Sequence, residues 1–352
     1  MERVLEPYVR ERVTLAPYTT LRLGGPARRF VEATSADEVV AAVTRADRAG
    51  EPVLVLGGGS NVVVADEGYP GTVVRVATRG VSVSRTEDGV LVRAQSGEEW
   101  EPFVARCVAE GLVGVECLSG IPGLLGATPI QNVGAYGQEI SDTLVAVRVL
   151  DRRTGEVVTL NAAQCGFTYR SSVFKGSDRY VVLEVTLALG RGQLGSPIRY
   201  AELARVLGVE VGERVPLADA RNAVFALRRS KGMVLDPADP DTRSVGSFFV
   251  NPVLTPERAA ELERRAPGFP RFGERGGRVK VPAAWLIERA GFGKGYAKGR
   301  ARISTKHTLA LTNPDSATTA ELVALAREVR AGVRDRFGVE LTSEPVLVGL
   351  SL

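Results

Sequence analysis

Residues 246–252 read GSFFVNP, and Ser247 carries the one hydroxyl in this stretch that could take part in chemistry. A glycine before it and two phenylalanines after it would hold its side chain in a dry, shaped place. A serine nucleophile needs a base, usually a histidine, to remove its proton. The chain has a single histidine, His307, which lies in no recognisable triad pattern. The residues therefore do not favour nucleophilic attack by Ser247, and a small residue packed under two rings is the structural alternative.

Two glycine-rich segments have the composition of nucleotide-binding loops. The first, GGGSN at 57–61, follows the apolar run 53–56, so several backbone N–H groups would lie together at the end of a strand. Such a nest binds a pyrophosphate without a lysine, although a plain tight turn has the same pattern. The second, residues 118–140, is too apolar for a linker and too rich in glycine for a helix or strand. Backbone packed against a ligand explains it, and two such loops could close on one dinucleotide.

The rest of the composition excludes several classes of site and partner. Neither the Rossmann glycine spacing nor a Walker P-loop occurs. One histidine and three scattered cysteines provide no metal-ligand cluster, and the odd cysteine count without a CxxC favours buried thiols in a reducing cytoplasm. The net charge of +4 suits a small anion better than nucleic acid. No apolar run approaches the ~20 residues of a membrane helix, and the N-terminus has no signal-peptide pattern.

The elements that must position these residues alternate between strands and helices. Capping boxes at Ser35–Glu38, Ser96–Glu99 and Thr318–Glu321 predict the starts of three helices. After about residue 215 the pattern is mainly helical, with a short β-like tail at the end of the chain. β-like runs occupy residues 27–33, 53–56, 62–64, 145–151, 155–160 and 180–189.

Five motifs in one order resemble the bacterial UDP-N-acetylenolpyruvoylglucosamine reductases. The match runs from TTLRLGGPA near the N-terminus to SEPVLVG in the tail, and so covers nearly the whole chain. The motifs are LGGGSN (56–61), SGIPGLLGATPIQNVGAYGQEI (119–140), YRSSVFKG (169–176), GSFFVNP (246–252) and WLIERAGFGKG (285–295).

The resemblance implies an α+β fold of three domains and a tail. Residues 1–78 and 79–215 would form an FAD-binding fold of the vanillyl-alcohol-oxidase (PCMH) type. Residues 216–338 would form a smaller α/β substrate-binding domain, and 339–352 a tail carrying a catalytic glutamate. The implied enzyme is a cytoplasmic monomer with non-covalent FAD, which takes NADPH as co-substrate and a UDP-sugar as substrate, without nucleic acid or membrane insertion.

The family reaction also implies a role for Ser247. NADPH reduces FAD, and hydride then reaches the enolpyruvyl group of UDP-N-acetylglucosamine enolpyruvate to give UDP-N-acetylmuramate for peptidoglycan. The resulting enolate needs a proton, which a serine hydroxyl can donate without a histidine base. By the same matching, Arg170 holds the substrate carboxylate and the developing enolate. Glu344 matches the catalytic glutamate, although Pro345 departs from the family pattern and the nearby Glu340 competes for the role.

The remaining site residues are carried over from the family motifs. His307 has a buried, satisfied histidine as its alternative role, and two rival functions remain. One is another FAD-dependent oxidoreductase of this fold, and the other is a non-catalytic nucleotide-binding module. The expected cofactor contacts are Gly57, Gly58, Gly59, Ser60, Asn61, Ser119, Gly123, Gly126, Gln131, Asn132, Gly134 and Tyr136. The expected substrate contacts are Tyr169, Tyr200, Lys231, Asn251 and His307.

Overall fold

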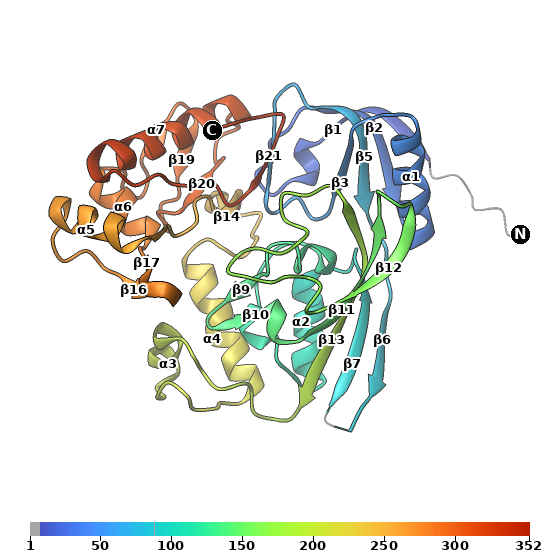
Figure 1. The fold of residues 1–352 in the computed structure, drawn as a ribbon, viewed down its shortest axis with the longest axis horizontal. Coiled ribbons are helices and arrows are strands. Elements are labelled where there is room, and N and C mark those ends of the chain that lie inside the picture. Colours follow the sequence, from blue (N-terminus) through green and yellow to red (C-terminus); the bar gives the residue numbers. More distant parts are fainter. Residues whose placement is uncertain (1–7, 88) are drawn as a thin grey trace, which may run out of the picture. The chain divides into compact units, whose positions relative to one another are not determined.

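Figure 1 shows a computed structural model of the chain, which describes residues 8–87 and 89–352. The described residues divide into two compact units that do not follow the chain order. Unit 1 takes the residues up to Val13 together with Ala27–Gly58 and Pro70–Ser230. Unit 2 takes Thr14–Pro26, Gly59–Tyr69 and Lys231–Leu352. The boundary between them therefore cuts the first glycine-rich loop after Gly58.

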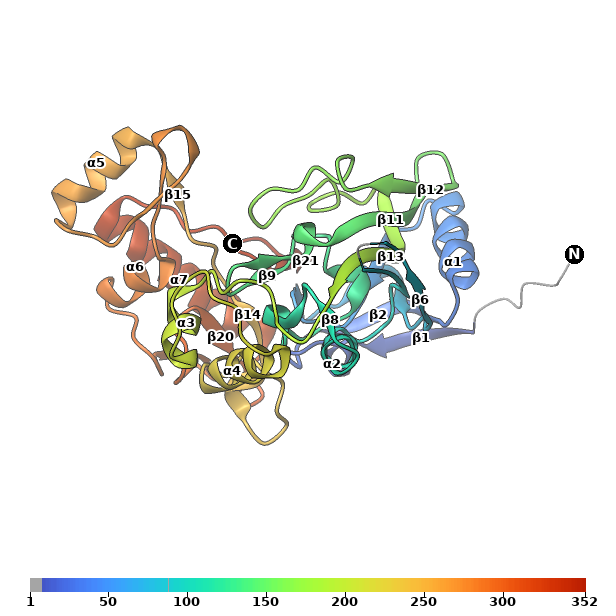
Figure 2. The ribbon, with the colours of Figure 1, turned by 90° about the horizontal axis from the view of Figure 1, so that it is seen from below.

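The first sheet of unit 1 carries a helix on one face (Figure 2). Its strand order is β1-β2-β5-β3, with β3 parallel to β5. The helix α1 (Ala36–Arg48) buries Val39 and Val43 against this sheet. The hydroxyl of Ser35 accepts a hydrogen bond from Glu38 N at 3.2 Å, as the capping pattern predicts. The strands are β1 (Val9–Thr14), β2 (Pro26–Ala33), β3 (Val53–Leu56) and β5 (Tyr69–Val76).

The second sheet of unit 1 is antiparallel and has the order β12-β11-β13-β7-β6, with β8 paired to β13. A core of buried side chains, centred on Trp100 and Phe103 of α2 (Trp100–Ala109), packs beneath it. The helices α3 (Ala201–Leu207) and α4 (Leu217–Ser230) lie side by side in Figures 1 and 2. The strands are β6 (Val81–Arg85), β7 (Val90–Gln95), β8 (Leu112–Val113), β11 (Leu144–Asp151), β12 (Glu156–Asn161) and β13 (Tyr180–Arg191).

The capping box predicted at Ser96–Glu99 is wrong. The helix α2 begins at Trp100, and the side chain of Glu99 makes no capping hydrogen bond. Ser96 is buried, and its carbonyl oxygen accepts from Gly126 N at 2.9 Å. Because this contact and a similar one at Glu98 hold the preceding residues against the second glycine-rich loop, the helix starts one turn later than predicted.

Unit 2 is built around the long helix α7 (Thr319–Phe337). The predicted capping box at Thr318–Glu321 is confirmed, and Gly338 ends the helix with a φ of 69°. The helices α5 (Pro256–Arg265) and α6 (Ala283–Arg289) complete its helical part. One sheet has the order β14 (Ser244–Ser247), β20 (Ala310–Thr312), β19 (Ala301–Ile303) and β18 (Ala297–Lys298), and another has β15 (Val253–Leu254), β17 (Val279–Lys280) and β16 (Phe272–Gly273).

Two short segments far apart in the sequence form a parallel pair in unit 2. These are β4 (Val62–Val64), which follows the first glycine-rich loop, and β21 (Val346–Val348) in the tail. The predicted α+β fold class is confirmed. The division into three domains with limits at 78, 215 and 338 stays a prediction.

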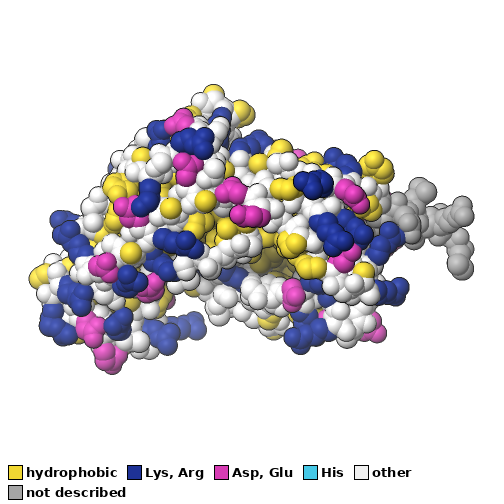
Figure 3. All heavy atoms as spheres, turned by 90° about the horizontal axis from the view of Figure 1, so that it is seen from above, with side chains coloured by type: hydrophobic (Ala, Val, Ile, Leu, Met, Phe, Trp, Pro, Cys, Tyr) yellow, Lys and Arg dark blue, Asp and Glu magenta, His cyan; other side chains and the backbone are white. Residues whose placement is uncertain are grey.

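Three further features of the described residues are the charge on the surface, the character of the helices and the state of the cysteines. Basic and acidic side chains are interspersed over the face drawn in Figure 3, with no single region of one sign. No helix among the described residues has the length and apolar character needed to cross a membrane. All three cysteines are buried as free thiols, and burial raises the pKa of Cys107 and Cys117 to about 12 and that of Cys165 to about 11.

Candidate active site

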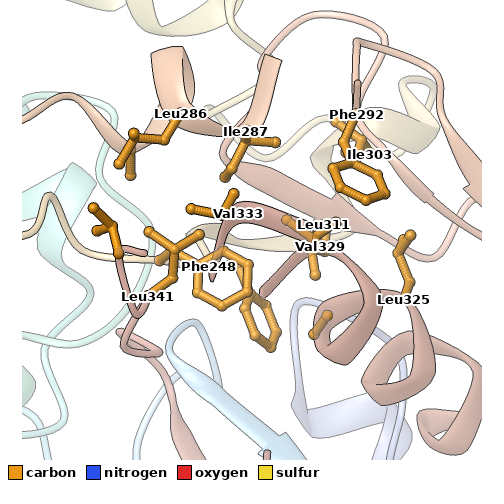
Figure 4. Packing of buried hydrophobic residues seen from close by; sticks show 14 of the residues in the cluster. Phe248, Leu286, Ile287, Phe292, Ile303, Leu311, Leu325, Val329, Val333 and Leu341 are labelled. Atoms are coloured by element: carbon orange, nitrogen blue, oxygen red, sulfur yellow. The ribbon is translucent and has the colours of Figure 1, made fainter. Parts of the chain in front are cut away.

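Ser247 is the last residue of β14 and is half-buried. The strand bends just before it, because Gly246 has a φ of 72°, a conformation that favours glycine. After it, Phe248 and Phe249 are both buried, with ring centroids 5.1 Å apart. Figure 4 shows Phe248 packed in the core of unit 2, among residues that include Leu286, Ile287, Val333 and Leu341. The backbone on both sides of Ser247 is thus constrained, by a glycine bend and by an aromatic anchor.

The C-terminal tail is hydrogen-bonded to the segment that follows Ser247. Glu344 N donates to Phe248 O at 2.9 Å, and Val250 N donates to Thr342 O at 3.1 Å. Glu344 is half-buried on this segment. The backbone of the expected glutamate is therefore bonded to the residue directly after the expected serine.

Glu340, the competing glutamate, has a different environment. It forms an ion pair with Arg330 of α7, with 3.2 Å between Oε1 and Nε, and its side chain is 51% exposed. Glu340 thus makes a surface pair of the kind that contributes little to stability. Of the two glutamates, Glu344 is therefore the one whose backbone is hydrogen-bonded to the residue next to Ser247.

The tail also contacts the first glycine-rich loop. Val346 N donates to Asn61 O at 3.0 Å, at the start of the β4–β21 pair. Thr20 makes a second connection, because its backbone N donates to Gly59 O at 3.1 Å and its hydroxyl donates to Ser244 O at 2.5 Å. The last residues of GGGSN are therefore linked both to the tail and to the strand of Ser247 within unit 2.

The first two glycines of GGGSN lie against the second glycine-rich loop within unit 1. A Cβ atom on Gly58 would lie 2.8 Å from Gly123 Cα, and one on Gly57 would lie 3.6 Å from Leu124 Cδ1. Further along, a Cβ on Gly126 would lie 2.3 Å from Ser96 Cβ. The two loops thus meet backbone to backbone, as close as glycine allows. This arrangement fits a dinucleotide cofactor held mainly by main-chain groups.

Arg170 is held on the second loop. Its Nη1 donates to Asn132 O at 3.3 Å, and its Nη2 donates to Gly134 O at 2.5 Å. Its φ of 53° is unusual for a residue with a side chain, and its side chain is 22% exposed. A Cβ on Gly134 would lie 2.8 Å from Nη1, so a larger residue there would require the guanidinium to shift. Arg170 is therefore part of a fixed network and not one more mobile surface arginine.

Two tyrosines expected to have different roles are in contact. The rings of Tyr136 and Tyr200 meet edge to face, with centroids 5.6 Å apart. Tyr200 directly precedes α3 and is 47% exposed. Tyr169 is 42% exposed, and the guanidinium of Arg170 lies 5.3 Å from its ring centroid. Unit 1 therefore gathers three expected site tyrosines around the second loop and its neighbours.

The other expected substrate residues lie in unit 2. Asn251 Oδ1 accepts a hydrogen bond from Ala283 N at 2.9 Å, at the start of α6. His307 is half-buried, and its backbone N donates to Ser304 Oγ at 3.2 Å. His307 is therefore partly buried, and its assignment as a substrate contact or as a satisfied structural histidine stays a prediction. Lys231 is also half-buried, at the start of the last segment of unit 2.

The expected residues thus fall into one group in each unit. Among the described residues, no group of three or more His, Cys, Asp or Glu side chains is arranged to hold a metal ion. Unit 1 contains Gly57, Gly58, Ser119, Gly123, Gly126, Gln131, Asn132, Gly134, Tyr136, Tyr169, Arg170 and Tyr200. Unit 2 contains Gly59, Ser60, Asn61, Lys231, Ser247, Asn251, His307 and Glu344.

Known proteins match both parts of the chain. The FAD binding domain family matches residues 27–161, and the UDP-N-acetylenolpyruvoylglucosamine reductase C-terminal domain matches residues 237–348. The reductase of Thermobifida fusca is 60% identical over 348 residues, which cover 97% of this chain and 98% of that protein. The chain belongs to the UDP-N-acetylenolpyruvoylglucosamine reductases. The reductase of Streptomyces coelicolor is 56% identical over 99% of this chain and 93% of its own length.

A crystal structure of the reductase from Thermus caldophilus matches 97% of this chain and all of that chain. Its sequence identity is 26% and the TM-score is 0.66. As a member of this family, the chain is an FAD-binding reductase that uses NADPH and makes UDP-N-acetylmuramate for peptidoglycan. The family assignment decides against both rivals, another oxidoreductase of the same fold and a non-catalytic binding module.

Two residues that contact the expected site residues are absent from the sequence predictions. Thr20 lies in TTLRLGGPA, at the N-terminal limit of the resemblance, and joins Gly59 to Ser244. Glu139 contacts both Asn132 and Arg170. A signal for Glu139 was available, because it is the only charged residue among residues 118–140.

Proposed function

We propose that Ser247 is the proton donor of this reductase. When bound and reduced by NADPH, FAD supplies a hydride to the terminal carbon of the enolpyruvyl group. The neighbouring carbon then gains a proton: the Oγ–H bond of Ser247 breaks as the new C–H bond forms, and the product is the lactyl ether. The serine alkoxide regains its proton from Glu344 or from water.

One observation carries this proposal. Glu344 N donates to Phe248 O at 2.9 Å, so the backbones of the two candidate proton-transfer residues belong to bonded segments of one unit. The buried rings of Phe248 and Phe249 fix the backbone next to the hydroxyl. General acid catalysis depends on such positioning, and a positioned acid contributes about 10²- to 10⁴-fold to the rate.

Arg170 is proposed to bind the substrate carboxylate and to stabilise the enolate that forms beside it. A planar guanidinium matches a carboxylate in two places, and fixed charge in a dry site stabilises a developing anion. The carbonyl oxygens of Asn132 and Gly134 support this role by holding the guanidinium. Tyr169, Tyr200, Lys231, Asn251 and His307 are proposed as further contacts to the UDP-sugar.

FAD is proposed to be non-covalent, with its pyrophosphate on Gly57–Asn61 and the rest of the cofactor along the second loop. The expected contacts there are Ser119, Gly123, Gly126, Gln131, Asn132, Gly134 and Tyr136. Acid denaturation followed by absorbance of the supernatant checks this, since covalent flavin would stay with the precipitate. The enzyme is further proposed to be cytoplasmic, because NADPH and nucleotide sugars are cytoplasmic metabolites. It is also proposed to be a monomer, which sedimentation of the purified protein tests.

Substrate-dependent NADPH oxidation by paired variants tests the assignments in unit 2. Ser247→Ala should lose about 10²-fold or more in turnover, and Ser247→Cys should recover part of it because a donor remains. Ser244→Ala removes the buried hydroxyl that accepts from Gly246 N at 3.2 Å, so it weakens the support of the same strand and should lose less activity than Ser247→Ala. Glu344→Gln should be slower than the matched Glu340→Gln. Equal losses for Ser247→Ala and Ser244→Ala would mean that the strand matters and the hydroxyl does not.

A further inference from the structure

We propose that Glu139 is a positioning residue that holds the guanidinium of Arg170 in place during reduction of the substrate. The proposal rests on the role proposed above for Arg170. Glu139 is the only charged residue in the segment 118–140, which otherwise consists of apolar, glycine and neutral polar residues. Its carboxylate belongs to a network of polar contacts that includes Asn132 and Arg170.

A tight hairpin fixes the position of Glu139. The strands β9 (Gly134–Ala135) and β10 (Gln138–Glu139) pair so that Glu139 lies opposite Gly134. At the tip, Tyr136 and Gly137 have φ values of 49° and 85°. Two successive residues with positive φ are typical of the type I′ turn, which fixes the register of a hairpin. Glu139 is thus set beside the glycine whose carbonyl oxygen binds Arg170.

The two carboxylate oxygens of Glu139 have different partners. Oε2 accepts a hydrogen bond from Asn132 Nδ2 at 2.8 Å, and Oε1 lies 3.9 Å from Arg170 Nη1. A distance of 3.9 Å is too long for a hydrogen bond, so the second contact is electrostatic. Glu139 therefore orients the guanidinium by charge, without the bidentate pairing that arginine and a carboxylate often adopt. That pairing would compete with a substrate carboxylate.

Gly134 provides the space in which these side chains meet. A Cβ on Gly134 would lie 2.8 Å from Arg170 Nη1 and 2.8 Å from Glu139 Cγ. The Asn132 amide completes the network, because Nδ2 also donates to Thr168 O at 3.2 Å, two residues before Arg170. Glu139 thus acts on Arg170 both directly and through the backbone that carries it.

The same network holds strained backbone. Asn132 and Arg170 have φ values of 45° and 53°, in a region that residues with side chains seldom occupy. Such conformations persist only where the surrounding structure holds them. The side chains of Glu139 and Arg170 are 37% and 22% exposed, so solvent screens their attraction only in part. Removing the carboxylate should therefore loosen the guanidinium and its turn.

The test uses the FAD-loaded enzyme and follows its two half-reactions separately. Glu139→Ala should slow reoxidation by the enolpyruvyl substrate about 10- to 100-fold, the range expected when a reacting group is misplaced. Reduction by NADPH and the amount of bound FAD per protein should stay near wild type. Glu139→Gln should lose less, because its amide oxygen can still accept from Asn132. Glu110→Gln is the matched control, since Glu110 pairs with Arg106 at 2.7 Å on α2 and is 44% exposed.

A double-mutant cycle with Arg170→Ala separates positioning from a general structural role. If Glu139 acts through Arg170, Glu139→Ala should have no further effect on reoxidation in the Arg170→Ala background. Multiplied effects in the double variant, or loss of bound FAD in Glu139→Ala, would overturn the proposal. A wild-type rate for Arg170→Ala would contradict the proposed role of Arg170 itself. An impaired Arg170→Ala beside a normal Glu139→Ala would sink the positioning role alone.

Discussion

The expected site residues of the two units are held in position by different kinds of structure. In unit 1 the expected site residues are held mainly by backbone contacts. Glycines allow the two loops to contact each other, and backbone carbonyl oxygens accept hydrogen bonds from Arg170. In unit 2 a hydrophobic core supports the site, because Phe248 next to Ser247 is wholly buried among the helices. Substitutions in the glycine-rich loops of unit 1 should therefore affect cofactor binding and the position of Arg170. Substitutions in the hydrophobic core of unit 2 should affect its folding.

This difference matches the group that each set of residues is proposed to act on, a cofactor at the glycine-rich loops and a proton at Ser247. A cofactor with a pyrophosphate is bound well by main-chain N–H groups, and glycine lets such loops approach one another and the cofactor closely. A proton donor must instead be held at one place and in one orientation, which a packed core achieves. The following predictions test this contrast, from the largest expected effect to the smallest.

Phe248→Ala should lower the free energy of unfolding of unit 2 by about 3–5 kcal/mol, as expected when a large buried ring is removed. The chain has two tryptophans, Trp100 in unit 1 and Trp285 in unit 2. In a Trp100→Phe background, the fluorescence of Trp285 during urea unfolding reports unit 2. The exposed Phe272, at 58%, is the control, and Phe272→Ala should leave the transition unchanged. Equal losses of stability in Phe248→Ala and Phe272→Ala would mean that burial of the Phe248 ring is not what stabilises unit 2.

Arg170→Lys should reduce the rate of reoxidation by substrate on the order of 10²-fold, although the charge is kept. A lysine cannot reproduce the planar fork or the two contacts to the carbonyl oxygens of Asn132 and Gly134. Stopped-flow absorbance of the reduced enzyme mixed with substrate measures this rate. A variant within a factor of a few of wild type would show that a point charge is sufficient.

Gly58→Ala should weaken FAD binding about tenfold or more without unfolding the protein. The new Cβ would lie 2.8 Å from Gly123 Cα, so the two loops must move apart. Titration of the FAD-free variant with FAD measures the affinity, and far-ultraviolet circular dichroism checks the fold. Gly192→Ala is the control in the same unit, since a Cβ on Gly192 would make only ordinary contacts, at 3.7 Å or more. Unchanged affinity for Gly58→Ala would contradict the backbone cradle.

The smallest effect is expected at Asp151, which stabilises unit 1 away from the loops. A hydrogen bond from Arg179 lowers the pKa of this carboxyl group below its usual value. Its contribution to stability is therefore present above the unfolded pKa of about 4 and is lost as the pH falls through the lower folded pKa. Asp151→Asn should lower the melting temperature by about 2 °C or less at pH 7, with the difference shrinking in acid. A difference that grew in acid would reverse the sign of this argument.

Much of the fold and of the site was predictable because local patterns agree with the structure. The runs at 53–56 and 62–64 are strands with those limits, and the box at Thr318–Glu321 begins α7. The capping box predicted at Ser96 is absent because Gly126 of the second glycine-rich loop, distant in the sequence, is hydrogen-bonded to the backbone of Ser96. Capping rules consider only neighbours in sequence, so they could not include that contact.

The assignment of site residues required the family resemblance, because the decisive contacts are between distant segments. Nothing near Ser247 in the sequence shows that Glu344, almost a hundred residues later, is bonded to Phe248. Likewise, the split of GGGSN between two units follows from pairing of β4 with the tail. Periodicity and composition locate loops and cores, whereas such long-range pairing depends on the whole fold.

The most direct test of the central claim, that Ser247 donates the proton, separates the two half-reactions of Ser247→Ala. Flavin absorbance is followed by stopped flow, first after mixing with NADPH and then after mixing the reduced enzyme with the enolpyruvyl substrate. Reduction by NADPH transfers no proton to the substrate, so it should proceed at a near-normal rate. Reoxidation should slow by about 10²-fold or more. Equal loss in both half-reactions would make Ser247 structural, and loss in neither would show that the proton comes from Glu344 or water.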